Sequence, residues 1–415
     1  MQQTEDMIAL GKEYQPFEKH LKDPFPFYER ARREGSIFFS PLVNAWVVSR
    51  YDDVKTILSQ PDIFSSKDTL LPPAEFPPSV FAELAQGYPQ TAIMINSDGR
   101  NHSRFRDPAL LALSPDRLKT LASFIRTRAN TLIDDFIADG EADIVSSFTY
   151  PLPIEVMLSL FNIPQERKAQ CKKWSSDLAA LFSMPLAEAR QVEYARSFVQ
   201  FQQYMAQLIA EHRAHPQEDF VSIMITTKLP GEEPLSDLEL INVLTGILLA
   251  GHETSTNVLG NGLAFFLKHQ EIWKQLCEHP EYIPKAYEEI LRYDAPSQGI
   301  LRTTTRKVVI GNVEIPSNTL VLLLLGSANR DETHFHSANE FQIDRKPNPH
   351  VAFGHGVHKC IGFPLARLQG RIAFEVLTRR LPDLRLAPNQ DLIPLPGLAF
   401  RGFPQLYVQW TPGKV

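Results

Sequence analysis

The chain has 415 residues, of which 43% are hydrophobic and 22% are charged, and its formal net charge is −6 at pH 7. This composition is typical of a globular protein with a large core, and it excludes an intrinsically disordered chain. Three cysteines are too few for a disulfide scaffold and suit a reducing compartment such as the cytoplasm, and the negative charge gives no reason to expect a nucleic-acid partner.

Helical patterns dominate the chain between residues 24 and 378. Before them, residues 1–7 contain no basic region followed by an apolar run, so we expect neither a signal peptide nor a membrane anchor there. The apolar stretch at 241–250 is too short to span a bilayer. The periodicity of apolar residues predicts helices at 24–34, 116–138, 164–182, 186–212, 237–268 and 284–293.

Strands are fewer, and the segments that predict them are short and apolar. They are 45–49 and 319–324, with a hairpin at 307–314 around Gly311-Asn312. Closely spaced prolines mark a long loop at 65–96, and loops of that length are often functional lids. No internal repeat and no linker rich in Gly and Ser appears, so we predict a single domain over residues 1–415, mainly α with small β-sheets.

The predicted helix at 237–268 carries a polar cluster in its apolar middle. Burying such groups without partners costs roughly a few kcal/mol, which suggests a chemical reason for them. An acid beside an alcohol, Glu253 beside Thr254, can deliver protons in a site that excludes water, and Gly251 would let the helix open locally. The structural alternative is a buried helix whose Ser and Thr hydroxyls bond back to preceding carbonyls. His252 is interpreted as a structural polar residue.

A single cysteine, Cys360, lies in the run FGHGVHKCIG at 353–362, framed by three glycines. A thiolate is a soft, strong metal ligand, and glycine lets the backbone approach a flat bulky group such as haem. The segment 364–374 has helical periodicity with a proline at its start, so its first amides would face the sulfur, lower the pKa of the thiol and keep it anionic. A buried structural cysteine would not need the glycines, and Cys171 and Cys277 do not supply the paired spacing of a zinc site.

The pattern Phe-Gly-x-Gly-x-His-x-Cys-x-Gly at 353–362 resembles the proximal loop of the cytochrome P450 family, and Ala-Gly-x-Glu-Thr at 250–254 resembles its acid and alcohol pair. The resemblance, to the soluble bacterial type, covers nearly the whole chain. It implies the cytochrome P450 fold, a helical triangular prism with haem b (iron protoporphyrin IX) between the oxygen-activating helix and the cysteine-loop helix. It further implies that Cys360 is the axial ligand of the haem iron, while Thr254 and Glu253 serve catalysis. The other haem contacts expected on these segments are Ala250, Gly251, Phe353, Gly354 and Gly362.

The resemblance also assigns partners to the two haem propionates, which need cationic or hydrogen-bonding groups inside a protein. His102 and Arg106 stand four residues apart, so one helical face can present both. Arg302 follows the turn 296–301, and His358 lies two residues before the cysteine. All four match propionate positions of the family.

Glu289 and Arg292 stand three residues apart on the predicted helix 284–293. Alone, such a pair is ordinary, because exposed pairs contribute only ~0.3 to 0.5 kcal/mol each. In the family that the chain resembles, the pair is buried and joined by an arginine, a position that Arg345 matches. We expect this triad to be structural and to anchor the cysteine loop.

The segments that the resemblance assigns to substrate binding are the loop 65–96, the helix near Phe182, 244–250, 296–301 and the turn Leu398-Ala399-Phe400. The predicted contact residues are Leu244, Ile247, Ala250, Gln298, Ile300, Leu301 and Phe400. Most are apolar, which implies a hydrophobic substrate such as a steroid, terpenoid, fatty acid or polyketide. It would receive one oxygen atom from O2 in a hydroxylation or epoxidation.

Electrons would come from a separate ferredoxin or flavodoxin and its reductase, because the sequence has no flavin or nicotinamide fingerprint. The positive patch expected to dock that partner consists of Arg104, Lys346, Lys359 and Arg367. We expect a cytoplasmic monomer. Two rival functions remain: a peroxide-driven peroxygenase of the same fold, which would typically lack the acid and alcohol pair, and a non-enzymatic haem sensor, which would need an effector module.

Overall fold

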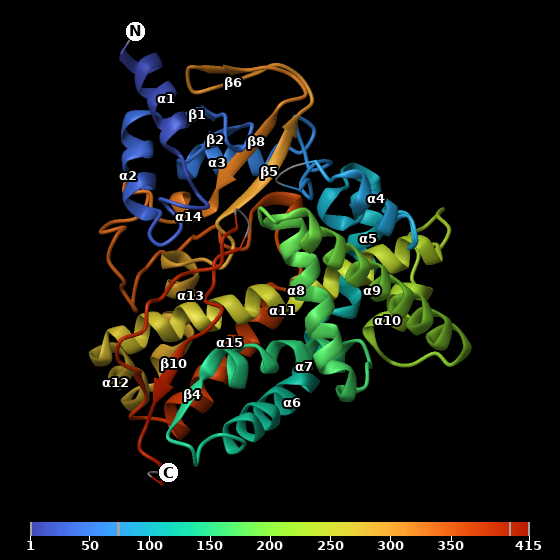
Figure 1. Cartoon of the computed structure of the whole chain (residues 1–415), viewed down its shortest axis with the longest axis vertical. Coiled ribbons are helices and arrows are strands. Elements are labelled where there is room, and N and C mark those ends of the chain that lie inside the picture. The colour runs from blue at the N-terminus through green and yellow to red at the C-terminus, as the bar shows by residue number, and fades with distance from the viewer. Residues whose placement is uncertain (1, 73–74, 398–399, 414–415) are drawn as a thin grey trace.

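One long helix runs through the middle of the molecule. The computed structural model describes residues 2–72, 75–397 and 400–413, and its longest helix, α11 (Asp237–Lys268), crosses the centre with other helices on both sides (Figure 1). A capping box begins α11, in which Ser236 Oγ accepts the backbone N–H of Glu239 and the Glu239 carboxylate accepts that of Ser236. None of the helices in these three ranges is both long enough and apolar enough to cross a membrane.

Among the remaining helices, α7, α8, α9, α10, α12, α13 and α15 pack directly against α11. The bounds of all the remaining helices are α1 (Gln2–Glu13), α2 (Phe25–Glu34), α3 (Tyr51–Leu58), α4 (Pro78–Leu84), α5 (Gly99–Ala112), α6 (Pro115–Asp134), α7 (Pro151–Leu160), α8 (Lys168–Ser183), α9 (Glu188–Ala214), α10 (Phe220–Thr226), α12 (Gln270–Glu278), α13 (Ile283–Tyr293), α14 (Leu325–Ala328) and α15 (Phe363–Arg380). Because α11 is apolar around most of its circumference, these neighbours bury it on nearly every side.

Three small sheets complete the fold. The largest has the order β1-β2-β8-β5-β3, in which β2 and β8 are parallel and the other pairs antiparallel, and it lies beside α1 and α2 (Figure 1). A second has the order β4-β10-β9, and β6 and β7 form a hairpin. The strands are β1 (Ile37–Ser40), β2 (Ala45–Val48), β3 (Phe64–Ser65), β4 (Glu141–Asp143), β5 (Gly299–Thr304), β6 (Val308–Ile310), β7 (Val313–Ile315), β8 (Leu320–Leu324), β9 (Arg385–Leu386) and β10 (Tyr407–Gln409).

The helices and strands predicted from the sequence are present, and the differences lie at their ends. The bounds of α11 are those predicted, and the strands at 45–49 and 319–324 and the hairpin at 307–314 are confirmed within a residue or two. The helix predicted at 116–138 ends at Asp134, because turns follow it up to Gly140, whose φ of +77° a helix cannot contain.

Two segments predicted as irregular contain regular structure. The loop predicted at 65–96 includes α4, so its exposed stretch is shorter than expected. The turn predicted at 296–301 passes directly into β5, whose residues pair with β8. Both were missed because prolines predict a loop or turn in each segment and hide the short element that lies within it.

Candidate functional site

A short stripe of α11 is accessible, although most of this helix is buried. Ala250 is exposed, and Ile247 and Thr254 are half-buried. Residues spaced by three and four lie on one face of a helix, so these side chains form a continuous strip. Thr254 Oγ1 donates to the carbonyl of Ala250 at 2.9 Å. The hydroxyl is therefore bonded within its own helix, as in the structural alternative, but it stands on the accessible strip.

Gly251 lies where α11 packs closely against α7. The helix is continuous from Asp237 to Lys268, so the local opening expected at Gly251 is absent from this described segment. A Cβ at Gly251 would lie 2.4 Å from Sδ of Met157 in α7. The glycine therefore lets α7 approach α11 closely, a long-range contact that the local sequence does not reveal.

Glu253 points away from that strip into a buried polar network. Its Oε1 accepts a hydrogen bond from Ser176 Oγ in α8 at 3.1 Å and lies 3.4 Å from His252 Nε2. Burial opposes ionisation, but the bonds from His252 and Ser176 and the nearby Lys172 hold the pKa of Glu253 below its usual value. His252 is fully buried and also contacts the Tyr150 hydroxyl at 3.2 Å. Sequence reasoning missed Ser176 and Tyr150, which no local motif marks.

Two glycines of the cysteine loop are required by the conformation of its backbone. Gly354 and Gly356 have φ values of +69° and +70°, which favour glycine. A Cβ at Gly356 would also lie 2.4 Å from the carbonyl oxygen of Leu58, so the loop presses against the end of α3. Gly362 lacks such a constraint, since a Cβ there would meet Cys360 Sγ at an ordinary 3.8 Å. A bond from Cys360 N to the carbonyl of Phe353, 2.8 Å long, closes the loop.

The expectation of a lowered thiol pKa at Cys360 is wrong for the protein itself. Desolvation by the surrounding segments raises the pKa of Cys360, although the residue is exposed at the surface of the loop and although the N–H groups of Gly362 and Phe363 and the charges of Arg106 and Arg367 act in the opposite direction. The amides at the start of α15 thus face the sulfur as predicted, but desolvation outweighs them. Coordination to a metal deprotonates a thiol outright, so a bound iron would supply what the amides alone do not.

Four side chains that can carry positive charge meet beside this loop, and we call them the cationic cluster: His102, Arg106, Arg302 and His358. The rings of His102 and His358 are 4.2 Å apart, and Arg106 Nη2 donates to the carbonyl of Lys359 at 2.6 Å. The structure therefore brings together residues from α5, β5 and the cysteine loop.

The cationic cluster has more positive capacity than its neighbours neutralise. Arg302 is buried and donates to neutral oxygens, those of Thr69 at 3.3 Å and Leu301 at 2.7 Å. Among the residues that the structure describes, neither arginine of the cluster forms an ion pair with a carboxylate, and the buried Nε2 of His102 has no hydrogen-bond partner. Of the two arginines, Arg302 is buried and Arg106 is half-buried. A buried cation without a counter-ion is costly, so this cluster fits a ligand with carboxylates, such as the two propionates of haem.

Titration behaviour follows from the same geometry. Burial lowers the pKa of His358 to about 3, and the neighbouring His102 and Arg302 add repulsion. Burial likewise lowers the pKa of Arg302 to about 10, against the attraction of Asp98. Asp98 Oδ1 lies 3.8 Å from His358 Nε2, too far for a hydrogen bond.

The triad that the sequence predicts is assembled in the interior. Glu289 and Arg292 are fully buried and joined by two hydrogen bonds, of 2.7 and 2.9 Å. Arg345 Nε donates to Glu289 Oε1 at 3.0 Å, and Asn348 Nδ2 donates to its Oε2 at 3.1 Å. Glu289 thus ties α13 to the chain segment that leads to the cysteine loop.

The positive patch predicted for partner docking is incomplete, because two of its four residues have their charges paired with acidic residues. Arg104 forms ion pairs with Glu232 and Glu239, and Arg367 forms a bidentate pair with Glu288. Counting charges along the sequence missed these pairs because the partners are far away in the chain. Of the four patch residues, Lys346 and Lys359 remain exposed.

The predicted substrate residues lie in different environments. Leu244 is completely buried in the core, so we do not retain it as a substrate contact. Ile247 and Ala250 lie on the accessible strip of α11, and Ile300 and Leu301 are half-buried in β5. The loop predicted as a lid reaches α11, because a Cβ at Gly246 would lie 2.8 Å from the Ile93 side chain, and Asn242 Nδ2 donates to the carbonyl of Pro89 at 3.0 Å.

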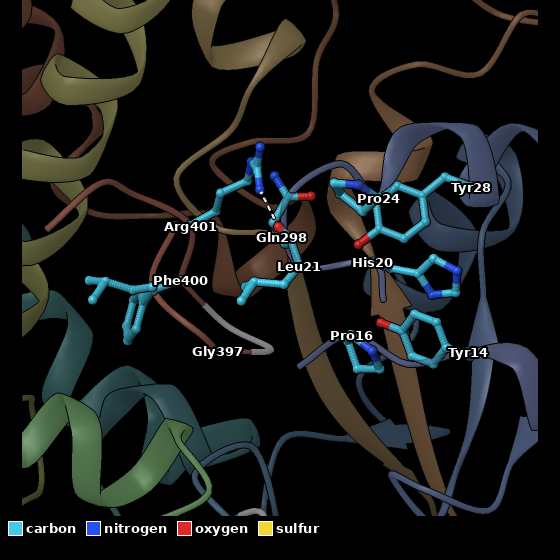
Figure 2. A pocket seen from close by; sticks show the side chains of 11 residues that line it. Tyr14, Pro16, His20, Leu21, Pro24, Tyr28, Gln298, Gly397, Phe400 and Arg401 are labelled. Atoms are coloured by element: carbon cyan, nitrogen blue, oxygen red, sulfur yellow. Dashed lines mark hydrogen bonds between the residues drawn. The ribbon is translucent and has the colours of Figure 1, made fainter. Parts of the chain in front are cut away.

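Gln298 and Phe400 line a different cavity, shown in Figure 2, together with Tyr14, Tyr28 and Arg401. Its volume of about 30 Å³ admits roughly one water molecule. A substrate of drug size needs at least ~300 Å³, so this cavity is no substrate site. Of the predicted C-terminal turn, Leu398 and Ala399 lie outside the described residues.

Comparisons with known proteins agree with this geometry. The family model described as cytochrome P450 matches residues 38–388. The chain is 34% identical over 357 residues to cytochrome P450 107B1 of Saccharopolyspora erythraea, covering 84% of this chain and 85% of that protein. It is 32% identical over 373 residues to the mycinamicin IV hydroxylase/epoxidase of Micromonospora griseorubida, covering 88% and 89%. The structure of cytochrome P450 CREJ in complex with (4-ethylphenyl) dihydrogen phosphate superimposes with a TM-score of 0.92 at 32% identity, over 97% of this chain and 100% of that chain.

Proposed function

The chain belongs to the cytochrome P450 family of haem-dependent monooxygenases, and from this premise we propose that it hydroxylates or epoxidises a hydrophobic small molecule. The family uses haem, needs O2 and receives its electrons from redox partners. The fold predicted from the sequence, mainly helical with small sheets, is that of the solved relatives. The roles of individual residues, the substrate class and the redox partner are our proposals.

The observation that carries the proposal is the cationic cluster beside the cysteine loop. Cys360 would ligate the haem iron, while His102, Arg106, Arg302 and His358 would hold the two propionates. Bound haem would supply the iron centre that activates O2, and a thiolate ligand favours cleavage of the O–O bond. The cluster supports this assignment because the guanidinium groups of Arg106 and Arg302 donate to neutral oxygens, and Arg106 donates to the carbonyl of Lys359, the residue before the thiol that would be the ligand.

On α11, Thr254 and Glu253 would deliver protons to the reaction. The Thr254 hydroxyl, now donating to the Ala250 carbonyl, stands on the accessible strip and can exchange that bond for one to a ligand. Glu253 would take protons from the network of Ser176 and His252 and turn toward Thr254 to deliver them. Gly251 would affect the position of the strip by allowing α7 to pack closely against α11.

The substrate would lie against the apolar strip of α11. Ile247 and Ala250 are accessible there, and the half-buried Ile300 and Leu301 would add apolar contacts. We propose a steroid, terpenoid, fatty acid or polyketide as the substrate class. The relative named as a mycinamicin IV hydroxylase/epoxidase supports the polyketide alternative.

The partners and setting are proposed from the sequence. A ferredoxin or flavodoxin with its reductase would supply electrons to a cytoplasmic monomer formed by one domain over residues 1–415. Three cysteines in a chain of this size support a reducing compartment. Docking would not rest on Arg104 or Arg367, whose charges are paired.

Two measurements test the proposal. Purified protein is titrated with a library of hydrophobic compounds and the spin-state change of its absorption spectrum is recorded, which should identify compounds that bind the strip. Cys360→Ser should abolish the absorption band typical of the CO adduct of a thiolate-ligated haem. If that band survives in Cys360→Ser, the ligand assignment is wrong.

A further inference from the structure

Two neighbouring carboxylates of α13 hold different parts of the chain. Glu289 binds Arg292, Arg345 and Asn348, as described above. Glu288, the residue before it, turns instead toward α15 and the start of the cysteine loop. This second set of contacts has no counterpart in the motifs considered so far, and it involves an arginine that the sequence assigns to a surface patch.

The contacts of Glu288 fix one guanidinium in place. Its Oε1 accepts from Arg367 Nε at 2.6 Å and its Oε2 from Arg367 Nη2 at 2.7 Å, a bidentate pair. His350 Nε2 lies 3.1 Å from the same Oε2, and His350 Nδ1 accepts the backbone N–H of Ala352 at 3.3 Å. Because Nδ1 is an acceptor, the proton of the ring is on Nε2 and is donated to Glu288. The pKa of Glu288 accordingly falls to about 2 against the opposing effect of burial, so the carboxylate is ionised at neutral pH.

Arg367 lies against the aromatic residues that flank the thiol. Its guanidinium carbon is 5.0 Å from the ring centre of Phe353 and 5.1 Å from that of Phe363, and these two rings are 6.1 Å apart. The carbonyl of Phe353 accepts the N–H of Cys360, and the N–H of Phe363 is directed at the sulfur. The charge of Arg367 is thus held at a fixed place beside the thiol, and it acts electrostatically on Cys360.

We propose that Arg367, positioned by Glu288 and His350, tunes the reduction potential of haem bound at Cys360. Reduction of the ferric iron adds one negative charge at the site, so a fixed positive charge nearby favours the reduced form and raises the potential. The carboxylate of Glu288 offsets part of that effect while it holds the guanidinium in position. This inference rests on the proposed haem ligation by Cys360.

The two members of the pair have opposite expected effects, which a merely structural role would not produce. Arg367→Gln removes the positive charge and should shift the midpoint potential to more negative values. Glu288→Gln removes the negative charge, leaves Arg367 uncompensated and should shift the potential to more positive values. Each haem-loaded variant is titrated with dithionite and mediators, and the midpoint potential is read from the absorption spectrum. Shifts of the same sign, or none, would overturn the proposal.

Controls separate this proposal from other causes. Glu375→Gln breaks the ion pair of α15 with Arg126, 2.6 Å long, and should leave the potential unchanged. Arg367→Lys keeps the charge but loses the bidentate geometry, so its potential should stay closer to wild type than that of Arg367→Gln. If Arg367→Gln does not retain haem, Arg367→Lys and Glu288→Gln still decide the question: a negative or zero shift in Glu288→Gln contradicts the proposal. The CO adduct of the wild type tests the ligation separately, because its thiolate band must be present whichever way the variants shift.

Discussion

The two segments that meet in the site are held in contrasting ways. On the cysteine side, Glu289 binds side chains that lie about 55 residues further along the chain, and its own carboxylate is fully buried. On the α11 side, Thr254 and Ser255 donate to carbonyls four residues back in the same helix. The cysteine loop is therefore positioned by the tertiary structure, whereas the α11 hydroxyls need only their helix. The loop should be sensitive to distant changes, and the hydroxyls should be free to change partner.

The largest loss of stability is expected at Glu289, where the long-range contacts that hold the cysteine loop converge. Glu289→Ala leaves the guanidinium groups of Arg292 and Arg345 buried without their partner, which should cost roughly 3–5 kcal/mol of unfolding free energy. The value is obtained from denaturant unfolding at neutral pH. Glu375→Ala, at a half-exposed ion pair on α15, is the matched control and should cost less than about 1 kcal/mol. Equal losses in the two variants would contradict the contrast between the segments.

A second test targets the contact between the loop and α3. Gly356→Ala must adopt a φ near +70° and bring its Cβ to 2.4 Å from the Leu58 carbonyl. Gly311→Ala has a similar φ, +57°, but open space around it, so it measures the backbone strain alone, about 1–3 kcal/mol. Gly356→Ala should therefore be the more destabilising in thermal unfolding and should also weaken haem retention. If the two variants unfold alike, the loop does not depend on its approach to α3.

A third prediction concerns the α11 side, where the hydroxyl groups bond within their own helix. Thr254→Val removes one bond within α11 and should change the unfolding free energy by only ~0.5–1.5 kcal/mol. It should nevertheless divert reducing equivalents to peroxide, because the proposed proton donor on the accessible strip is gone. The ratio of peroxide formed to NAD(P)H consumed, with a surrogate ferredoxin and reductase, measures this.

Ser255→Ala is the control for that measurement, because Ser255 makes the same kind of bond at 3.2 Å but is buried. Tight coupling in Thr254→Val, or equal uncoupling in both variants, would contradict the role of Thr254.

The smallest expected effect is a change in acid sensitivity at Glu288. Its pKa is lowered from 4.5 to about 2 in the folded protein, with Arg367 and His350 overcoming the cost of burial. A group with a depressed folded pKa stabilises the protein above its unfolded pKa, and this contribution is lost as the pH falls through the folded value. Wild type should therefore lose stability between about pH 4.5 and 2, and Glu288→Gln should lose less over that range. Parallel pH profiles of the melting temperature would show that Glu288 does not contribute.

Much of the site could be predicted from local sequence patterns, because helix ends, helix faces and tight turns depend on residues that are close together in the chain. The bounds of α11 follow from its capping box and its apolar periodicity, and positive φ values explain Gly354 and Gly356. The position of Gly251 was also visible, but its reason was not, because Met157 lies about 94 residues away in the chain.

The failed expectations have a common physical cause. A lowered pKa at Cys360 was inferred from the amides of one helix, whereas desolvation by the segments packed around the loop decides the direction, even though the residue itself is exposed. Arg104 and Arg367 were assigned to a positive patch because their acidic partners, Glu239 and Glu288, are remote in sequence. Desolvation and charge pairing both depend on which distant segments meet, and no single stretch of sequence contains that information.

The adjacency of Glu288 and Glu289 has a consequence for how this chain can change over evolution. Successive residues of a helix point about 100° apart, which is what lets neighbouring carboxylates reach separate segments. Inserting or deleting one residue in α13 before them would rotate both by that angle, and each would lose its partners at once. Point substitutions at exposed positions of α13 remain acceptable, but its length between Ile283 and Glu289 should be invariant among functional descendants.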